Sequence, residues 1–405
     1  MITALRQRLP DALFVGVGGP KMAAAGCRLL ANPVGRSAML VGAVFTEARY
    51  WMKTLKVIRK ELADIQPNVV IPIDSSAINL RIAALAHRQK IPVCYYVAPQ
   101  VWATRPWRVK KIAANVNTLC CILPFEEPYF RKRRVNAVYV GHPMFDTPAD
   151  DPAFDPLAVD PPLPGLKPAG ESRAATGKST PRLPFSRMTS SGPEPTYDSP
   201  RVALFPGSRR AEIDAHMPAM LEIISEIKGR FPRVNFVAVA PSEERAWQIR
   251  HHLRSANTPV DIRVGMADPI IRWADLVLTK SGTATLQVAR HAKPMVVMYA
   301  VAWWKWHLFA KFVIQTKFIS LVNILAGREL VPEYIPFYGS PLPIARECID
   351  MLAKPELRRA MSKELAELVS YLQPHGGLLA ADRVAEEVLR LMQPPPAAAQ
   401  NPSNS

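Results

Sequence analysis

Residues 204–213 read Leu204-Phe205-Pro206-Gly207-Ser208-Arg209-Arg210-Ala211-Glu212-Ile213. The apolar run stops at Pro-Gly-Ser and opens into a polar segment with helical spacing, which predicts a strand, a tight loop and a helix start. Gly207 lets the backbone come close to a ligand, and Ser208 can cap the helix, whose first N–H groups then face an anion. Arg209 and Arg210 would strengthen this site, because a guanidinium binds two phosphate oxygens at once. Taken alone, the stretch fits an ordinary capped turn equally well.

A second stretch favours the anion site. Residues 276–287 read Leu276-Val277-Leu278-Thr279-Lys280-Ser281-Gly282-Thr283-Ala284-Thr285-Leu286-Gln287 and predict another strand, a Ser-Gly-Thr loop and another helix start. Two such turns in one open α/β sheet can meet at the carboxyl ends of their strands, where these folds bind nucleotides. One ligand with a diphosphate group would explain both loops.

Composition predicts a cytoplasmic protein with an anionic partner. The 405 residues leave room for two domains, and 51 basic against 34 acidic residues give a net charge of +17. Five scattered cysteines without metal-ligand spacing, together with the lack of a signal peptide, predict core thiols in a reducing compartment. The cysteines are Cys27, Cys94, Cys120, Cys121 and Cys348. The longest clean apolar run, residues 294–304, is well short of a membrane span.

The order of segments predicts an α/β chain with two Rossmann-like parallel-sheet domains. Strands and helices alternate over residues 1–146 and again over 201–372. Between them, residues 147–200 are rich in proline and small polar residues, which predicts a disordered insertion. A C-terminal helix is expected within 373–393, followed by a disordered tail at 394–405.

Asp74 follows a predicted buried strand, residues 68–73, in the N-terminal domain. A carboxylate just past the carboxyl end of a strand is well placed for catalysis, and equally well placed to cap the next helix. The residues alone favour the cap. The loop at 98–111, with prolines, tryptophans and four cations, predicts a functional loop rather than a basic helix start with buried tryptophans. His142 is expected to be a hydrogen-bonded structural group.

Residues 302–318 mix tryptophans with lysines. This mixture suits a bilayer interface, since the rings lie at headgroup depth and the cations face acidic lipid, although a buried helix between domains is the alternative. The following residues, 323–333, are dense in polar side chains, and we expect a loop that touches ligand.

Seven motifs together resemble the lipid-A-disaccharide synthase family and occur in that family's order. They are Val15-Gly16-Val17-Gly18-Gly19-Pro20-Lys21-Met22, Tyr95-Tyr96-Val97-Ala98-Pro99-Gln100-Val101-Trp102-Ala103, Leu123-Pro124-Phe125-Glu126, Gly141-His142-Pro143, Pro206-Gly207-Ser208-Arg209, Ser281-Gly282-Thr283-Ala284 and Asn323-Ile324-Leu325-Ala326-Gly327-Arg328-Glu329. The resemblance covers nearly everything except the insertion, the tail and the very start.

The resemblance implies a GT-B fold, whose two Rossmann-like domains face an interdomain cleft, and catalysis without metal or other cofactor. The implied reaction joins UDP-2,3-diacylglucosamine to 2,3-diacylglucosamine 1-phosphate through a β-1,6 bond and releases UDP, with the acceptor in the N-terminal domain and the donor in the C-terminal one. It also implies a cytoplasmic protein associated peripherally with the anionic inner face of the cytoplasmic membrane. A homodimer is among the oligomeric states that the sequence permits.

The resemblance also assigns residue roles. Asp74 matches the family's proposed general base, which takes the proton of the acceptor's 6-hydroxyl. The UDP diphosphate would be held by Gly207, Ser208 and Arg209 with Ser281, Gly282 and Thr283, which replace the metal. The loop near the donor would supply Asn323, Arg328 and Glu329, and the membrane-facing region would supply Trp303, Trp304 and Trp306.

Three departures from the family pattern bear on activity. The family begins with a strand and a Gly-Glu-Ala-Ser-Gly-Asp loop, and this sequence starts after both, so we expect UDP binding to survive while transfer is slow or absent. Gln287 stands where the family has a glutamate for the ribose diol, which predicts a loss of roughly 1–2 kcal/mol in binding. Ala77 replaces a frequent second aspartate.

Two rival functions follow from these features. A non-catalytic UDP-sugar or lipid-binding homologue would explain the missing first loop. A nucleic-acid binder would explain the charge of +17, but the basic residues alternate with acidic ones and form no recognised nucleic-acid module, so no nucleic-acid partner is predicted.

Overall fold

The computed structural model describes residues 1–33, 41–146, 199–254, 259–300, 316–337, 339–372 and 377–393, with backbone alone for 41–48. The predicted insertion, the C-terminal tail and the Trp-Lys stretch lie mostly or wholly outside these ranges. The chain forms two compact units. Unit 1 comprises Met1–Thr147, Phe312–Thr316 and Leu372–Ser405, and unit 2 comprises Pro148–Lys311 and Lys317–Tyr371.

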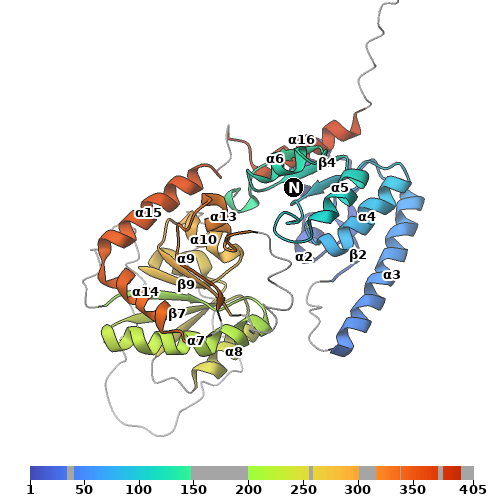
Figure 1. The fold of residues 1–405 in the computed structure, drawn as a ribbon. Coiled ribbons are helices and arrows are strands. Elements are labelled where there is room, and N and C mark those ends of the chain that lie inside the picture. Colours follow the sequence, from blue (N-terminus) through green and yellow to red (C-terminus); the bar gives the residue numbers. More distant parts are fainter. Residues whose placement is uncertain are drawn as a thin grey trace, which may run out of the picture. The chain divides into compact units, whose positions relative to one another are not determined.

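Unit 2 is built on a six-stranded parallel sheet. Its strands are β6 (Arg201–Phe205), β7 (Asn235–Ala240), β8 (Val260–Val264), β9 (Leu276–Lys280), β10 (Met295–Ala300) and β11 (Glu333–Phe337), in the order β8-β7-β6-β9-β10-β11. One face is covered by α7 (Arg210–Arg230), α8 (Glu243–Leu253) and α14 (Leu342–Ala353). The other is covered by α9 (Ala267–Trp273), α10 (Thr283–Arg290) and α13 (Leu321–Ala326), with α15 (Pro355–Ser370) against α10 (Figure 1).

Burial on both faces explains why the central strands of unit 2 are nearly continuous apolar runs. The strand order reverses between β6 and β9, which is the doubly wound arrangement that the sequence predicts. The expectation of a loop over all of 323–333 is wrong at its two ends, because α13 extends to Ala326 and β11 begins at Glu333, which leaves 327–332 as the connection between them. Neither α13 nor β11 has a strong sequence signal, since α13 has only six residues and β11 is an edge strand that contains Pro336.

Unit 1 holds two smaller parallel sheets. They are formed by β1 (Val15–Val17) with β2 (Arg28–Ala31), and by β3 (Cys94–Tyr96), β4 (Thr118–Cys121) and β5 (Ala137–Tyr139). The helices are α1 (Ile2–Arg8), α2 (Pro20–Ala24), α3 (Val41–Ile65), α4 (Ser76–Arg88), α5 (Val109–Asn115), α6 (Glu126–Arg131) and α16 (Ala380–Met392), with short 3₁₀ turns η1 (Pro106–Arg108) and η2 (Pro143–Phe145).

The strand predicted at 68–73 is reduced to two isolated parallel bridges, Val70 to Val93 and Ile73 to Tyr96. Pro72 lies between them and has no N–H to donate, although its carbonyl still accepts from the amide of Tyr96 at 2.9 Å. The segment therefore runs beside β3 without completing a regular strand.

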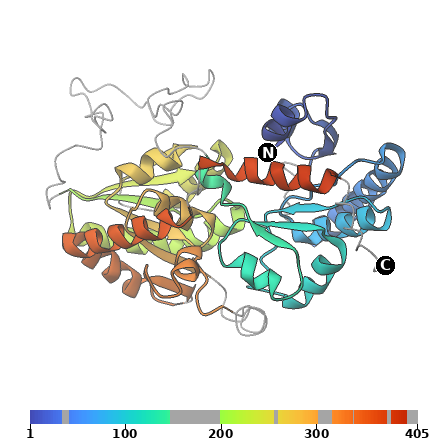
Figure 2. The ribbon, with the colours of Figure 1, turned by 90° about the horizontal axis from the view of Figure 1, so that it is seen from above.

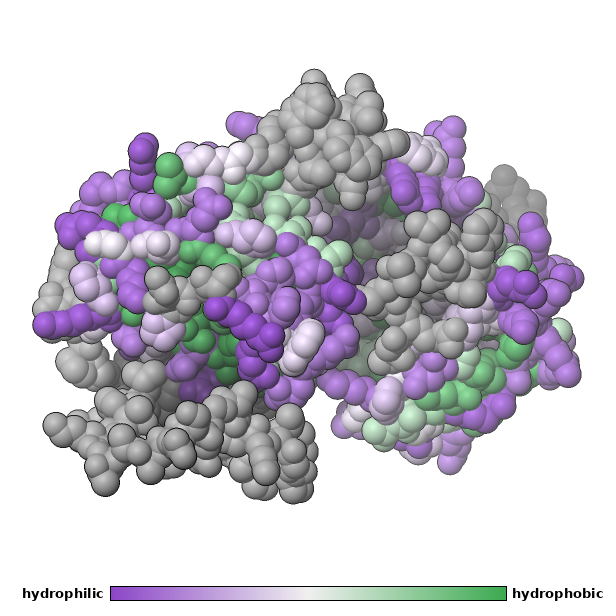
Figure 3. Space-filling view, turned by 90° about the horizontal axis from the view of Figure 1, so that it is seen from below, coloured by the Kyte–Doolittle hydropathy of each residue, from purple (hydrophilic) through white to green (hydrophobic). Residues whose placement is uncertain are grey.

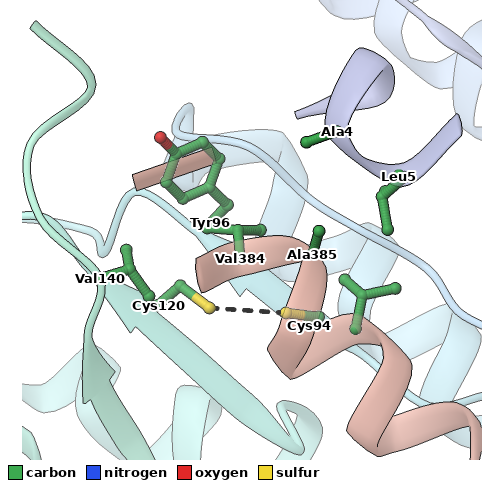
Figure 4. Close-up of a cluster of buried hydrophobic side chains, with 9 residues drawn as sticks. Ala4, Leu5, Cys94, Tyr96, Cys120, Val140, Val384 and Ala385 are labelled. Carbon is green, nitrogen blue, oxygen red and sulfur yellow. Dashed lines mark hydrogen bonds between the residues drawn. The ribbon is translucent and has the colours of Figure 1, made fainter. Parts of the chain in front are cut away.

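The last helix, α16, packs on unit 1 beside α1 and β3 (Figure 2). Its apolar side chains meet Leu5 and the strand cysteines in one core (Figure 4). The Asp146 carboxylate accepts from the amides of Ala380 and Ala381, at 2.7 and 3.1 Å, and so caps the N-terminus of α16.

All five cysteines are buried and free, as expected for core thiols. On the surface, hydrophilic side chains dominate the described part of the face seen in Figure 3, with smaller apolar patches between them.

Candidate functional site

The two predicted anion-binding loops lie next to each other in unit 2. Strands β6 and β9 are neighbours, with Phe205 paired to Thr279, and each loop follows its strand directly. Both loops therefore leave the carboxyl edge of the sheet at the point where the strand order reverses, which is where doubly wound sheets bind their ligands.

The first loop is wrapped around the carboxylate of Glu212. Oε2 of Glu212 accepts from the amides of Ser208 and Arg209, at 3.0 and 3.3 Å, and Oε1 lies 3.1 Å from the Arg209 guanidinium. Helix α7 has Arg209 as its N-cap, so the expectation that Ser208 caps it is wrong. Gly207 has φ +139°, and a Cβ there would lie 2.6 Å from Cβ of Glu212. The close approach that Gly207 permits is thus to Glu212.

Lys280, the last residue of β9, joins the two loops. Its Nζ lies 3.1 Å from Oε1 of Glu212, and a Cβ on Gly282 would lie 3.2 Å from Cε and Nζ of Lys280. Burial alone would raise the pKa of Glu212, but the Ser208 amide and the Lys280 ammonium outweigh it, so this pKa lies below its ordinary value. The site is therefore electropositive and already holds one carboxylate.

Backbone donors in both helix starts remain available to a ligand. Within the described chain, the amides of Arg210 and Ala211 in α7, and of Thr283 and Ala284 in α10, have no hydrogen-bond acceptor. In the second loop, Ser281 is buried, and Gly282 is the N-cap of α10 with φ +152°. The arrangement can bind an anion with two helix N-termini and two cationic side chains.

Asp74 lies in unit 1, in a strained turn. Asp74 and Ser75 have φ of +52° and +42°, which costs non-glycine residues about 1–2 kcal/mol each. The turn is held by Tyr95 Oη, 2.6 Å from the Asp74 carbonyl oxygen, and by Asn79 Nδ2, 2.8 Å from the same atom. Ser75 is the N-cap of α4, so the expectation that Asp74 caps this helix is wrong. The Asp74 side chain is exposed.

The two tryptophans of the 98–111 loop differ in burial. Trp102 is buried and donates to Oε1 of Glu126 at 3.0 Å, while Trp107 is 64% exposed. Burial raises the pKa of Glu126 to about 7, against the bonds from Trp102 and two amides. Nδ1 of His142 accepts from the Met144 amide, and burial lowers the pKa of His142 to about 4, so it is the structural group that we expect.

Three of the four remaining predicted site residues of unit 2 have protein partners. Asn323 is fully buried, and its amide donates to the Val331 carbonyl and to Glu333 and accepts from the amides of Leu330 and Val331. Arg328 pairs with Glu364, and Glu329 is exposed. Gln287 hydrogen-bonds to Asp268 and, after His291, helps to lower the pKa of that carboxyl.

Sequence reasoning missed Glu212, Lys280 and Tyr95 as parts of these sites. Glu212 could have been found, because it stands three residues after the N-cap, where a carboxylate reaches back to the loop. Lys280 and Tyr95 give no such local signal. Trp303, Trp304 and Trp306 lie outside the described residues, and none of the described helices is long and apolar enough to cross a membrane.

Comparison with known proteins gives relatives over nearly the whole chain. The family model described as lipid-A-disaccharide synthetase matches residues 1–155 and 195–376. A lipid-A-disaccharide synthase from Anaeromyxobacter sp. (strain K) is 34% identical over 96% of this chain and 92% of its own length. The Myxococcus xanthus enzyme of the same name is 33% identical over 97% and 94%.

Solved structures show the fold. The UDP-GlcNAc 2-epimerase of Neisseria meningitidis, bound to UDP-GlcNAc, has a TM-score of 0.51 and 11% identity, covering 96% of this chain and 95% of its own. The complex of S. aureus MnaA with UDP has a TM-score of 0.56 and 8% identity, covering 93% and 95%. The GT-B type fold with two Rossmann-like units is thereby confirmed. With a family model over most of its length and relatives above 30% identity, the chain belongs to the lipid-A-disaccharide synthetase family.

Proposed function

We propose that this chain is an inverting glycosyltransferase of lipid A biosynthesis. It joins UDP-2,3-diacylglucosamine to 2,3-diacylglucosamine 1-phosphate through a β-1,6 bond and releases UDP. Family membership supports the class of reaction. The observation that carries the proposal for this chain is the pair of loops at the strand-order reversal, where two helix starts and two cations converge. No observation favours a non-catalytic binding homologue.

The donor's diphosphate would lie over the starts of α7 and α10. The backbone amides at the starts of these helices that have no acceptor among the described residues can donate to an anion. The Arg209 side chain is 80% exposed and can turn from Glu212 toward a ligand. As the glycosidic bond breaks, negative charge grows on the diphosphate, and these donors stabilise it in place of a metal. The first loop is formed by Gly207 and Ser208, and the second by Ser281, Gly282 and Thr283.

The acceptor would meet Asp74 in unit 1. The acceptor's 6-oxygen attacks the anomeric carbon, the bond from that carbon to the diphosphate oxygen breaks, and UDP leaves with the electron pair. Asp74 takes the hydroxyl proton, so one base and one stabilised leaving group suffice for inversion. The strained turn, whose Asp74 carboxylate is exposed and has no ion-pair partner among the described residues, supports this role, since strain of this kind collects at functional sites.

The other predicted donor residues would act at the edge of this site. Asn323 orders the segment that carries Arg328 and Glu329, because it precedes that segment on α13 and its amide bonds to Leu330 and Val331 at the segment's far end. Gln287 would face the ribose diol, with its amide held by Asp268.

Acylated substrates must be drawn from a bilayer, so we further propose that the chain docks on the anionic inner face of the cytoplasmic membrane. Net charge +17 supports this, and Trp303, Trp304 and Trp306 would lie at headgroup depth. A homodimer stays a prediction, which sedimentation equilibrium would test.

The test is turnover by the purified full chain. Synthetic donor and acceptor should give disaccharide and UDP in equal amounts, without added metal and in the presence of a chelator. UDP binding with no disaccharide formed would favour the non-catalytic homologue.

A further inference from the structure

Of the two cations at the anion site, Arg209 and Lys280, only Arg209 has so far been given a contact with the ligand. We propose that Lys280 is a further catalytic residue, whose ammonium contacts the leaving diphosphate, and that Glu212 is the positioning residue that holds this ammonium between the two loops. The inference rests on the proposed function and names an additional residue for the same site.

The position of Lys280 is fixed from three directions. Its Nζ lies 3.1 Å from Glu212 on α7, its stem passes over the Gly282 backbone at the start of α10, and Nζ lies 5.5 Å from the centre of the Tyr299 ring on β10. The side chain is 16% exposed, whereas that of Arg209 is 80% exposed. Lys280 is therefore the ordered cation of the site and needs little rearrangement to meet a ligand.

The charges at the site favour a ligand over a purely structural pair. Arg209 and Lys280 against Glu212 leave one net positive charge, next to two helix starts. A UDP-sugar carries roughly two negative charges on its diphosphate, and free UDP carries roughly three. A cation fixed where that charge develops stabilises the transition state more than the bound donor.

Glu212 explains how this cation stays in place before the donor binds. Its carboxylate accepts hydrogen bonds from groups that could otherwise bind an anion: two amides, a guanidinium and an ammonium. Loss of this carboxylate would free the Lys280 side chain and open the Ser208 loop. Glu212 thus acts through Lys280 and the loop without touching substrate.

The test compares Lys280→Met with Lys363→Met, which removes the same charge from an exposed position on α15 of the same unit. We expect Lys280→Met to lower kcat about 10- to 100-fold and to weaken UDP binding by a smaller factor. Lys363→Met should keep both values. Ethylammonium should partly restore kcat of Lys280→Ala, which a structural role would not predict.

A double variant separates catalysis from folding. Lys280→Met with Glu212→Gln removes both charges of the buried pair and keeps one side-chain oxygen for the Ser208 and Arg209 amides, while the exposed Arg209 guanidinium can return to solvent, so the thermal midpoint should stay near that of the wild type. We expect it to remain as slow as Lys280→Met. Recovery of the wild-type rate in the double variant, or an unchanged rate and UDP affinity in Lys280→Met, would overturn the inference. If the wild type formed no disaccharide, the proposed function would fail, and UDP titration of the same variants would still decide the Lys280 contact.

Discussion

Tyr95→Phe should slow transfer about tenfold while leaving UDP affinity unchanged. The substitution removes one oxygen, which lies 2.6 Å from the Asp74 carbonyl oxygen, and Asn79 still donates to that carbonyl at 2.8 Å. A hydrogen bond of this kind contributes about 0.5–1.5 kcal/mol. The left-handed conformation of Asp74 costs about 1–2 kcal/mol, which is similar. The turn can then relax, and a loss of about 1.4 kcal/mol, at the upper end of that range, lowers the ratio of the productive to the relaxed conformer tenfold.

The assay is disaccharide formation under saturating substrates, with UDP affinity measured by calorimetry. UDP affinity should hold because the diphosphate loops belong to unit 2 and Tyr95 belongs to unit 1. Tyr96→Phe is the matched control, because Tyr96 neighbours Tyr95 on β3 but packs in the core with α16. Equal rates for Tyr95→Phe and the wild type would refute the claim that this hydroxyl positions Asp74.

Four further outcomes are expected. Asp74→Asn should abolish turnover and keep UDP affinity, since Asn tolerates the same backbone conformation; a variant that keeps most of its rate would remove Asp74 as the base. Arg209→Ala should weaken UDP binding by about 1.5–3 kcal/mol, measured by calorimetry, and unchanged affinity would take this loop out of the site. The pKa of His142, about 4 in the fold against an ordinary 6.5, gives stability that is present above about pH 6.5 and lost as pH falls toward 4. Between pH 6.5 and 4, the free energy of urea unfolding should therefore fall by up to about 3 kcal/mol more in the wild type than in His142→Asn. Equal falls in the two proteins would contradict the lowered pKa of His142. The wild type should bind anionic vesicles, and a variant with serine in place of Trp303, Trp304 and Trp306 should not. Persistent vesicle binding by this variant would exclude the three indole rings as the membrane contact.

Much of the fold could be predicted from the sequence because its signals are local. The bounds of α8 and β8 follow from capping residues and apolar patterns, and the Gly-Ser-Arg and Ser-Gly-Thr turns identify the neighbouring loops of unit 2. The contact between Glu212 and Lys280 could not be predicted, since it joins residues 68 positions apart.

Two other features depend on tertiary structure in the same way. The positive φ of Asp74 has no local signature, because side chains from β3 and α4 stabilise it. Asn323 has the composition of a ligand-binding residue, yet its buried amide is used entirely by its own segment.

The placement of α16 has a consequence for biosynthesis. Arg8 on α1 pairs with Asp382 on α16, 374 positions later, and α16 also covers the core around Leu5. A ribosome synthesises the whole sheet of unit 2 before it reaches α16, so unit 2 can fold while unit 1 still waits for its last helix. Unit 1 is thus the later of the two units to be completed by synthesis, against the usual order in which the N-terminal domain is finished first. Until α16 arrives, the apolar faces of α1 and β3 are open to chaperones and to misassembly.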